Sequence, residues 1–193
     1  MKNASKLFFI LIVLMAIGCK NETQNTPVLQ ENTASAEILV EAVPKALHKM
    51  NGATAFALKP SEIYSKDSLP KSKEAYCVIM DVALNDKKTS IVAFKTGEAT
   101  FSINNMDLQF EKNPQSFNSL STSLVEKAEK SLSQFTPATT REEPNQNQVK
   151  IYVLTGDNKY VYENKITELK KNKEIQDIFE SAMTLFSESR KAL

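Results

Sequence analysis

Residues 75–84, AYCVIMDVAL, constrain the fold more than any other part of the sequence. Every side chain in this stretch except Asp81 is apolar, and successive side chains of a strand point to opposite faces of a sheet. A strand that is apolar on both faces is typical of the centre of a sheet covered on both sides. The sequence therefore predicts a core on each side of this strand. Asp81 is the exception, since a buried carboxylate is costly unless it is paired or hydrogen-bonded.

Four more segments have the composition of strands and are bounded by turn residues. The first two follow the central strand directly and predict a three-stranded antiparallel meander. The last two are separated by a four-residue turn and predict a hairpin. A shorter apolar segment, 53–58, predicts one further strand. The four segments are 89–96, 99–103, 149–154 and 159–163.

Three segments carry apolar residues at spacings of three and four, which predicts three helices. The first begins at Ser35 and ends at Asn51-Gly52, and the second begins at Asn113-Pro114. Antiparallel strands with interposed helices imply an α+β fold, with the sheet packed against the helices in a single domain at 35–193. The third segment lies at the C-terminus and places on one face Ile175, Ile178, Phe179, Ala182, Met183 and Phe186.

Polar segments join these elements. The segment 59–74 contains two prolines and many polar residues, and it predicts a loop long enough to be functional or mobile. The segment 136–148 predicts a second polar loop. A third, 104–114, follows the meander.

The N-terminus has the pattern of a secretory signal peptide. Lys2 and Lys6 precede an uncharged, mostly apolar run at 7–18, which is shorter than the roughly 20 residues that a membrane-spanning helix needs. The run ends in Ala16-Ile17-Gly18-Cys19, which resembles the lipobox of bacterial lipoproteins. The resemblance implies that residues 1–18 are removed. Cys19 then carries a diacylglycerol on its sulfur and a further acyl chain, such as palmitate, on its amino group.

This resemblance also implies a location in the bacterial cell envelope. Two or more acyl chains give stable anchoring, since each buried methylene contributes about 0.8 kcal/mol. An Asp directly after the lipidated Cys favours retention in the inner membrane. Lys20 stands there instead, so the outer membrane is expected, on its periplasmic or its surface face. The polar residues 19–34 lack periodicity and predict a flexible tether.

Charge, cysteine and glycine content argue against several classes of function. Without Lys2 and Lys6 the chain has 22 of its 24 basic residues against 23 acidic ones, a net charge of −1, whereas nucleic-acid binders are basic. Cys77 is then the one remaining cysteine, so no internal disulfide is expected. The three glycines after residue 18 are isolated from one another and do not make a nucleotide-binding loop, which needs several close together.

Two motifs connect the region 74–190 with known sequences. Phe94-Lys95-Thr96-Gly97-Glu98-Ala99 lies at a predicted hairpin, and Tyr152-Val153-Leu154-Thr155 lies at a predicted strand end. With these motifs the region resembles a family of small uncharacterised bacterial domains, which implies an α+β fold and no particular activity. Members carry a Gly-rich loop after the third strand. Here 104–114, NNMDLQFEKNP, contains no glycine.

Candidate catalytic residues are few. Cys77 and Asp81 share one face of a strand, and His48 completes the residue types of a Cys-His-Asp arrangement. Cys77 lies in the most apolar part of the chain, however, where a thiol has a raised pKa and low reactivity. We assign no catalytic residue. A single histidine without grouped ligands predicts no metal site, and no cofactor is expected.

Candidate binding residues lie on the second hairpin and the central strand. Alternation places Tyr160 and Tyr162 on one face, and Tyr152 lies on the same hairpin. Either these tyrosines cover the core with their hydroxyls in water, or they form a partner surface, since Tyr is enriched at binding hot spots. Asp81 either lies near the strand end or meets a Lys, Arg or Tyr, or it anchors a small pocket. The loop 104–114 is a further candidate surface.

These observations together predict a lipid-anchored, non-enzymatic envelope protein. It is expected to contact the membrane through lipid on Cys19 and to bind a partner protein, a peptide or an envelope component. The alternative is a small enzyme that acts on cell-wall or imported material. A purely structural lipoprotein is a third class.

Overall fold

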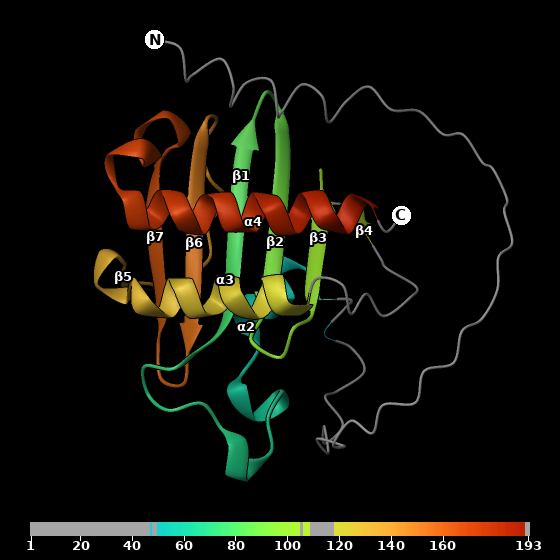
Figure 1. Ribbon diagram of the computed structural model, residues 1–193, viewed down its shortest axis with the longest axis vertical. Coiled ribbons are helices and arrows are strands. Elements are labelled where there is room, and N and C mark those ends of the chain that lie inside the picture. The colour runs from blue at the N-terminus through green and yellow to red at the C-terminus, as the bar shows by residue number, and fades with distance from the viewer. Residues whose placement is uncertain (1–46, 48–49, 105, 109–117, 192–193) are drawn as a thin grey trace, which may run out of the picture. The chain divides into compact units, whose positions relative to one another are not determined.

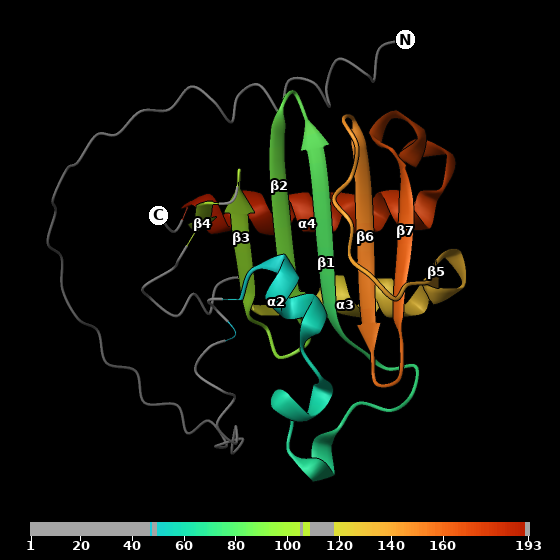
Figure 2. The ribbon, with the colours of Figure 1, turned by 180° about the vertical axis from the view of Figure 1, so that it is seen from behind.

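A computed structural model describes residues 47, 50–104, 106–108 and 118–191, all of which belong to one compact unit, Val40–Leu193. The described residues form one seven-stranded sheet in which all neighbouring strands are antiparallel. Helices lie on both faces of this sheet, as Figure 1 and Figure 2 show from opposite sides. The predicted α+β class is therefore confirmed.

The strand order is β4-β3-β2-β1-β6-β7-β5, which places the apolar strand β1 at the centre, as the sequence predicts. β1 pairs with β2 on one side and with β6 on the other, so the predicted meander and hairpin belong to one sheet. The predicted number of strands in the sheet is too small, because two short edge strands, β4 and β5, extend the sheet beyond these five. The strands are β1 (Ala75–Leu84), β2 (Lys87–Phe94), β3 (Ala99–Ile103), β4 (Met106–Leu108), β5 (Thr136–Pro137), β6 (Gln148–Thr155) and β7 (Lys159–Lys165).

Two long helices, α3 (Asn118–Lys130) and α4 (Lys173–Lys191), run across the strands on one face (Figure 1). Both helices are predicted by the sequence, and most of the expected apolar stripe of α4 is buried, namely Ile175, Ile178, Ala182 and Phe186. The predicted start of α3 at Asn113-Pro114 lies outside the described residues. Short 3-10 turns follow α3 at Leu132–Gln134 and precede α4 at Ile166–Lys171. No helix of the described part of the chain is long and apolar enough to cross a membrane.

A third helix, α2 (Gly52–Ala57), lies on the opposite face (Figure 2). The sequence predicts a strand at 53–58, and this prediction is wrong. The side chain of Asn51 accepts a hydrogen bond from the backbone N–H of Thr54 at 3.0 Å, so Asn51-Gly52 begins a helix rather than ending one. A six-residue apolar run is too short for periodicity to separate helix from strand.

The predicted helix that begins at Ser35 lies outside the described residues, apart from Leu47 and Met50. In the described part of the chain the sequence predicts α3 and α4, whereas the structure also contains α2. The predicted number of helices is therefore wrong.

The loop 59–74 projects beyond the end of the sheet at which the turn between β6 and β7 lies (Figure 1). It contains two 3-10 turns, Pro60–Glu62 and Lys66–Ser68, and the buried side chain of Ile63. Its C-terminal part encloses the turn between β6 and β7. A Cβ on Gly156 in that turn would lie 2.5 Å from two carbonyl oxygens of the loop, so only glycine allows this close approach.

The two faces of the sheet carry separate cores. Towards α3 and α4, β1 contributes side chains such as Val78 and Met80 to an extensive apolar core. Towards α2, it contributes Cys77 and Ile79 to a smaller one. The next side chain of β1 on the α2 side is Asp81. In Figure 2, α2 covers only one end of this face, and the site described next lies beyond it.

Candidate functional site

A line of polar side chains crosses six strands on the face that α2 covers in part. Strand register alone brings them together, because each residue pairs with the next across the sheet. Paired residues point to the same face of a sheet, so the six side chains share the α2 face. We call this set the polar row: Asp107 of β4, Ser102 of β3, Ser90 of β2, Asp81 of β1, Lys150 of β6 and Glu163 of β7.

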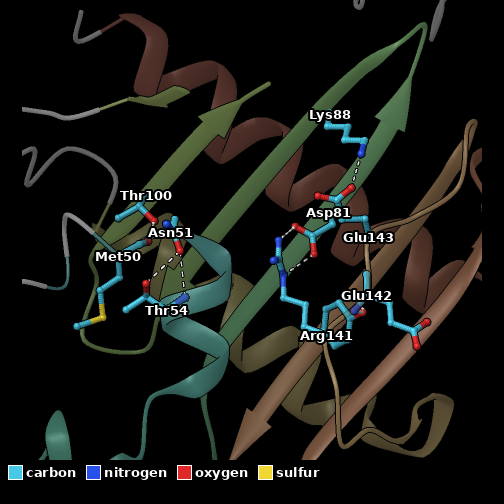
Figure 3. A network of polar contacts seen from close by, with 10 residues as sticks. Met50, Asn51, Thr54, Asp81, Lys88, Thr100, Arg141, Glu142 and Glu143 are labelled. Atoms are coloured by element: carbon cyan, nitrogen blue, oxygen red, sulfur yellow. Dashed lines mark hydrogen bonds and ion pairs between the residues drawn. The ribbon is translucent and has the colours of Figure 1, made fainter. Parts of the chain in front are cut away.

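Asp81 is paired with Arg141, as Figure 3 shows. The Nε of Arg141 donates to one carboxylate oxygen at 2.9 Å, and Nη2 donates to the other at 2.7 Å. Asp81 is only 4% exposed, and this two-point geometry is the strong form of a carboxylate ion pair. The expectation that Asp81 meets a Lys, Arg or Tyr is confirmed, and the partner is Arg141.

Arg141 belongs to a segment, 138–147, that joins β5 to β6 and runs along the α2 face beside β6 (Figure 2). Three consecutive side chains of this segment contact three different strands: Arg141 contacts Asp81, Glu142 contacts Lys150, and Glu143 contacts Lys88. The pair of Glu143 with Lys88 is more than half exposed, and the hydrogen bond from Lys88 lowers the pKa of Glu143. The segment is thus attached across β2, β1 and β6.

Lys150 is the second buried charge of the polar row. Its side chain is 8% exposed, and Nζ lies 3.2 Å from a carboxylate oxygen of Glu142 and 3.3 Å from one of Glu163. Burial lowers the pKa of Lys150, but the hydrogen bonds to these two carboxylates outweigh it, so the pKa is raised overall. The ammonium group therefore stays charged at neutral pH.

Tyr152 fixes the segment 138–147 through its hydroxyl group. Its hydroxyl donates to the carbonyl of Glu142 and accepts from the N–H of Glu142, both at 2.9 Å. The side chain is 1% exposed and packs edge-on against Phe56 of α2. Tyr152 is therefore part of the core and not of a binding surface.

Tyr160 and Tyr162 lie on the other face of the sheet. They share a face with each other, as predicted, and both are half-buried against the core under α3 and α4. The ring of Tyr162 meets Phe135 with 6.1 Å between centroids, and its hydroxyl accepts from Asn164 at 3.1 Å. The three tyrosines of the hairpin do not form one surface, and the geometry favours the reading in which they cover the core.

A pocket of about 300 Å³ opens beside Arg141. Gly52 allows Arg141 to approach, since a Cβ there would lie 2.7 Å from Nη2 of Arg141 and 2.8 Å from Oγ of Ser90. The hydroxyl of Ser90 is buried and has no hydrogen-bond partner. Four of the six residues of the polar row line the pocket, Asp81, Ser90, Ser102 and Asp107, together with Asn51, Gly52, Lys88, Arg141 and Glu143 among others. Asp81 thus lies in the lining of a small pocket, and its role as an anchor for a ligand there stays a prediction.

Some donor and acceptor groups that line this pocket have no partner among the described residues. A guanidinium has five N–H donors, and Asp81 takes two from Arg141. Asp107 is exposed and forms no ion pair within the described residues. The pocket thus presents fixed donors at one end and a carboxylate at the other.

The residues of the Cys-His-Asp arrangement do not form a nucleophilic site in the described part of the chain. Cys77 and Asp81 share a face, as predicted, but Cys77 is fully buried, and this burial raises the pKa of its thiol well above the ordinary value. His48 lies outside the described residues. Among the described residues no group of His, Cys, Asp and Glu side chains is arranged to hold a metal ion.

The loop 104–114 is described only in part. Residue 105 and residues 109–114 lie outside the described residues, and 106–108 form β4 rather than a loop. Among the described residues of the predicted loop, Asp107 of this strand lines the pocket.

Comparison of the chain with known protein families, with curated proteins and with solved structures finds no match. Both resemblances noted in the sequence therefore stay predictions.

Proposed function

We propose that this chain is a lipid-anchored, non-enzymatic protein of the bacterial outer membrane whose domain binds a small polar ligand, or the end of a partner chain, in the pocket beside the polar row. The pocket itself carries the binding part of the proposal. It combines a rigidly held guanidinium with a buried serine hydroxyl that lacks a partner. A few convergent polar groups in a concave site are the usual signature of ligand binding.

The anchor rests on the sequence. Lys2, Lys6, the apolar run 7–18 and Gly18-Cys19 have the order of a lipoprotein signal peptide. Lys20 favours the outer membrane. These residues lie outside the described part of the chain.

The environment of the candidate nucleophile supports binding over catalysis. Cys77 is buried in an apolar core, where the thiolate is disfavoured. Asp81 is engaged at both oxygens by Arg141, which leaves little freedom for proton transfer. A small enzyme acting on cell-wall or imported material has no comparable support in the described residues.

Two matched cysteine variants test the anchor. We expect Cys19→Ser to lose labelling by radioactive palmitate and to leave the membrane fraction or accumulate unprocessed. Cys77→Ser, the control, should label and fractionate like the native chain. Unchanged labelling and membrane association of Cys19→Ser would exclude lipidation at this residue.

A photoreactive lysine analogue tests the pocket in living cells. Lys88 lines the pocket and is more than half exposed, while Lys173 is exposed at the start of α4 on the opposite face. We expect illumination to add an adduct of defined mass to the protein labelled at position 88 and not to the one labelled at 173. Identical adduct patterns, or none at position 88, would contradict a ligand in this pocket.

A further inference from the structure

We infer that the pocket takes a short zwitterionic peptide, about the size of a dipeptide, with its carboxylate at Arg141 and its ammonium group at Asp107. This inference rests on the proposed binding function and names the ligand class of the same pocket. It follows from three features of the lining: donors at one end, net charge, and the distance between the two ends.

The donor end is prepared for a carboxylate. Asp81 holds Nε and Nη2 of Arg141, so the guanidinium plane is fixed, and three N–H groups, two on Nη1 and one on Nη2, have no acceptor among the described residues. A guanidinium edge binds a carboxylate through two parallel hydrogen bonds. Nη2 and Oγ of Ser90 both pack against Gly52, and the Ser90 hydroxyl has no contact with water, so the donors at this end come from the guanidinium.

The charges of the lining favour a ligand that also has a positive end. Arg141 is neutralised by Asp81, and Lys88 is neutralised by Glu143. Asp107 is the one charge of the lining without an ion pair in the described residues, and it is exposed. A simple anion at Arg141 would be repelled by Asp107, whereas an ammonium group on the same ligand would be attracted to it.

The strand register sets the length of the ligand. Ser90 pairs with Ser102, and Ser102 pairs with Asp107, so the two ends are separated by two strand spacings, about 10 Å in all. A hydrogen bond of about 3 Å at each end leaves roughly 4 Å or more for the ligand. Termini separated by one or two residues of about 3.5 Å each match this gap. A pocket of about 300 Å³ is also at the small end of the range for ligand sites.

Three dipeptide probes test this inference on the full chain solubilised in detergent. Alanyl-alanine has both charges, N-acetyl-alanyl-alanine lacks the ammonium group, and alanyl-alanine amide lacks the carboxylate. By equilibrium dialysis we expect saturable binding of alanyl-alanine and several-fold weaker binding of each derivative. Equal binding of all three probes would overturn the inference.

The matched pair Asp107→Asn and Asp177→Asn locates the ammonium group. Both aspartates are exposed, and Asp177 lies on α4, beyond the opposite face of the sheet. We expect Asp107→Asn to bind alanyl-alanine about fivefold more weakly, the size expected of a solvent-exposed ion pair, and to bind the N-acetyl derivative as the native chain does. Asp177→Asn should bind all probes normally. An unchanged affinity of Asp107→Asn would overturn the assignment.

The photoreactive Lys88 protein separates the ligand class from the proposed function. If alanyl-alanine fails to bind at roughly 10 mM while an adduct forms in cells at position 88, the pocket binds another ligand. The dipeptide assignment is then wrong, and the proposed binding function is kept. If alanyl-alanine does not bind and no adduct forms at position 88, both the dipeptide assignment and the proposed binding function are wrong.

Discussion

The two faces of the sheet differ in how they exclude water. On the face under α3 and α4, two helices cross the central strands and the buried side chains are mostly apolar, with a few hydroxyls such as those of Ser121 and Ser189. On the other face α2 covers only one end, and beyond it the buried side chains are charged or hydroxylic. The change occurs within single strands: along β1, Cys77 and Ile79 are followed by Asp81, and along β6, Leu154 and Tyr152 are preceded by Lys150.

This difference shows that a sheet face without a helical cover is closed here by ion pairs from an irregular segment. The 138–147 segment has few apolar residues to bury. It instead supplies Arg141 and Glu142, which form ion pairs with the strand residues Asp81 and Lys150. Apolar contacts stabilise in proportion to area, whereas these pairs depend on geometry and on both partners being present. The two faces should therefore respond differently to substitution.

The largest effect is expected on the helix-covered face. Ile151 of β6 is fully buried in that core, so Ile151→Ala removes apolar contacts and leaves a cavity. We expect the free energy of unfolding to fall by about 2–5 kcal/mol, measured by urea denaturation. Ser102→Ala on the partly covered face should change it by no more than about 0.5 kcal/mol. A similar loss in both variants would remove the distinction between the faces.

A loss within the same range is expected when the central ion pair is broken. Asp81→Asn leaves Arg141, which is 19% exposed, without its carboxylate partner. We expect a loss of about 3 kcal/mol, near the lower limit for a buried pair because Arg141 is partly in water. In a double-mutant cycle with Arg141→Gln, the two losses should not add, because the second substitution removes the charge that the first leaves unpaired. Additive losses would show that the two side chains do not stabilise each other.

Local pattern predicted the helix-covered face well. The strand 75–84 is apolar on both faces and was placed at the centre of the sheet, and the apolar spacing of α3 and α4 predicted both helices. These features depend on the hydrophobic effect along one element, which periodicity records. The helix α2 was missed because its six residues are too few for a period.

The polar row could be predicted only in part. Asp81 stood out as a charge inside an apolar strand, and Lys150 has the same position in β6, so their opposite charges could have indicated that β1 and β6 pair. Arg141 could not be found in this way. It lies 60 residues from Asp81 in a polar segment without periodicity, and only the path of that segment over the sheet brings the two together.

The smallest effect is expected at the rim of the helix-covered face, where an ion pair also occurs. Lys95 Nζ lies 2.7 Å from a carboxylate oxygen of Glu74, and both side chains are about one third exposed. The hydrogen bond from Lys95, helped by one from the N–H of Lys71, lowers the pKa of Glu74. Because exposure screens such a pair, Glu74→Gln should cost less than about 1 kcal/mol at pH 7.

The pH dependence of that loss distinguishes the charge from the packing of the side chain. A carboxyl group whose pKa is lowered by folding stabilises the folded state above its unfolded pKa, about 4.3 for Glu, and this contribution disappears as the pH falls through the folded pKa. The difference in unfolding free energy between the native chain and Glu74→Gln should therefore shrink to zero between roughly pH 5 and pH 3. A difference that stays constant over this range would mean that Glu74 acts through contacts rather than charge. The rim of the covered face would then resemble its apolar interior and not the polar row.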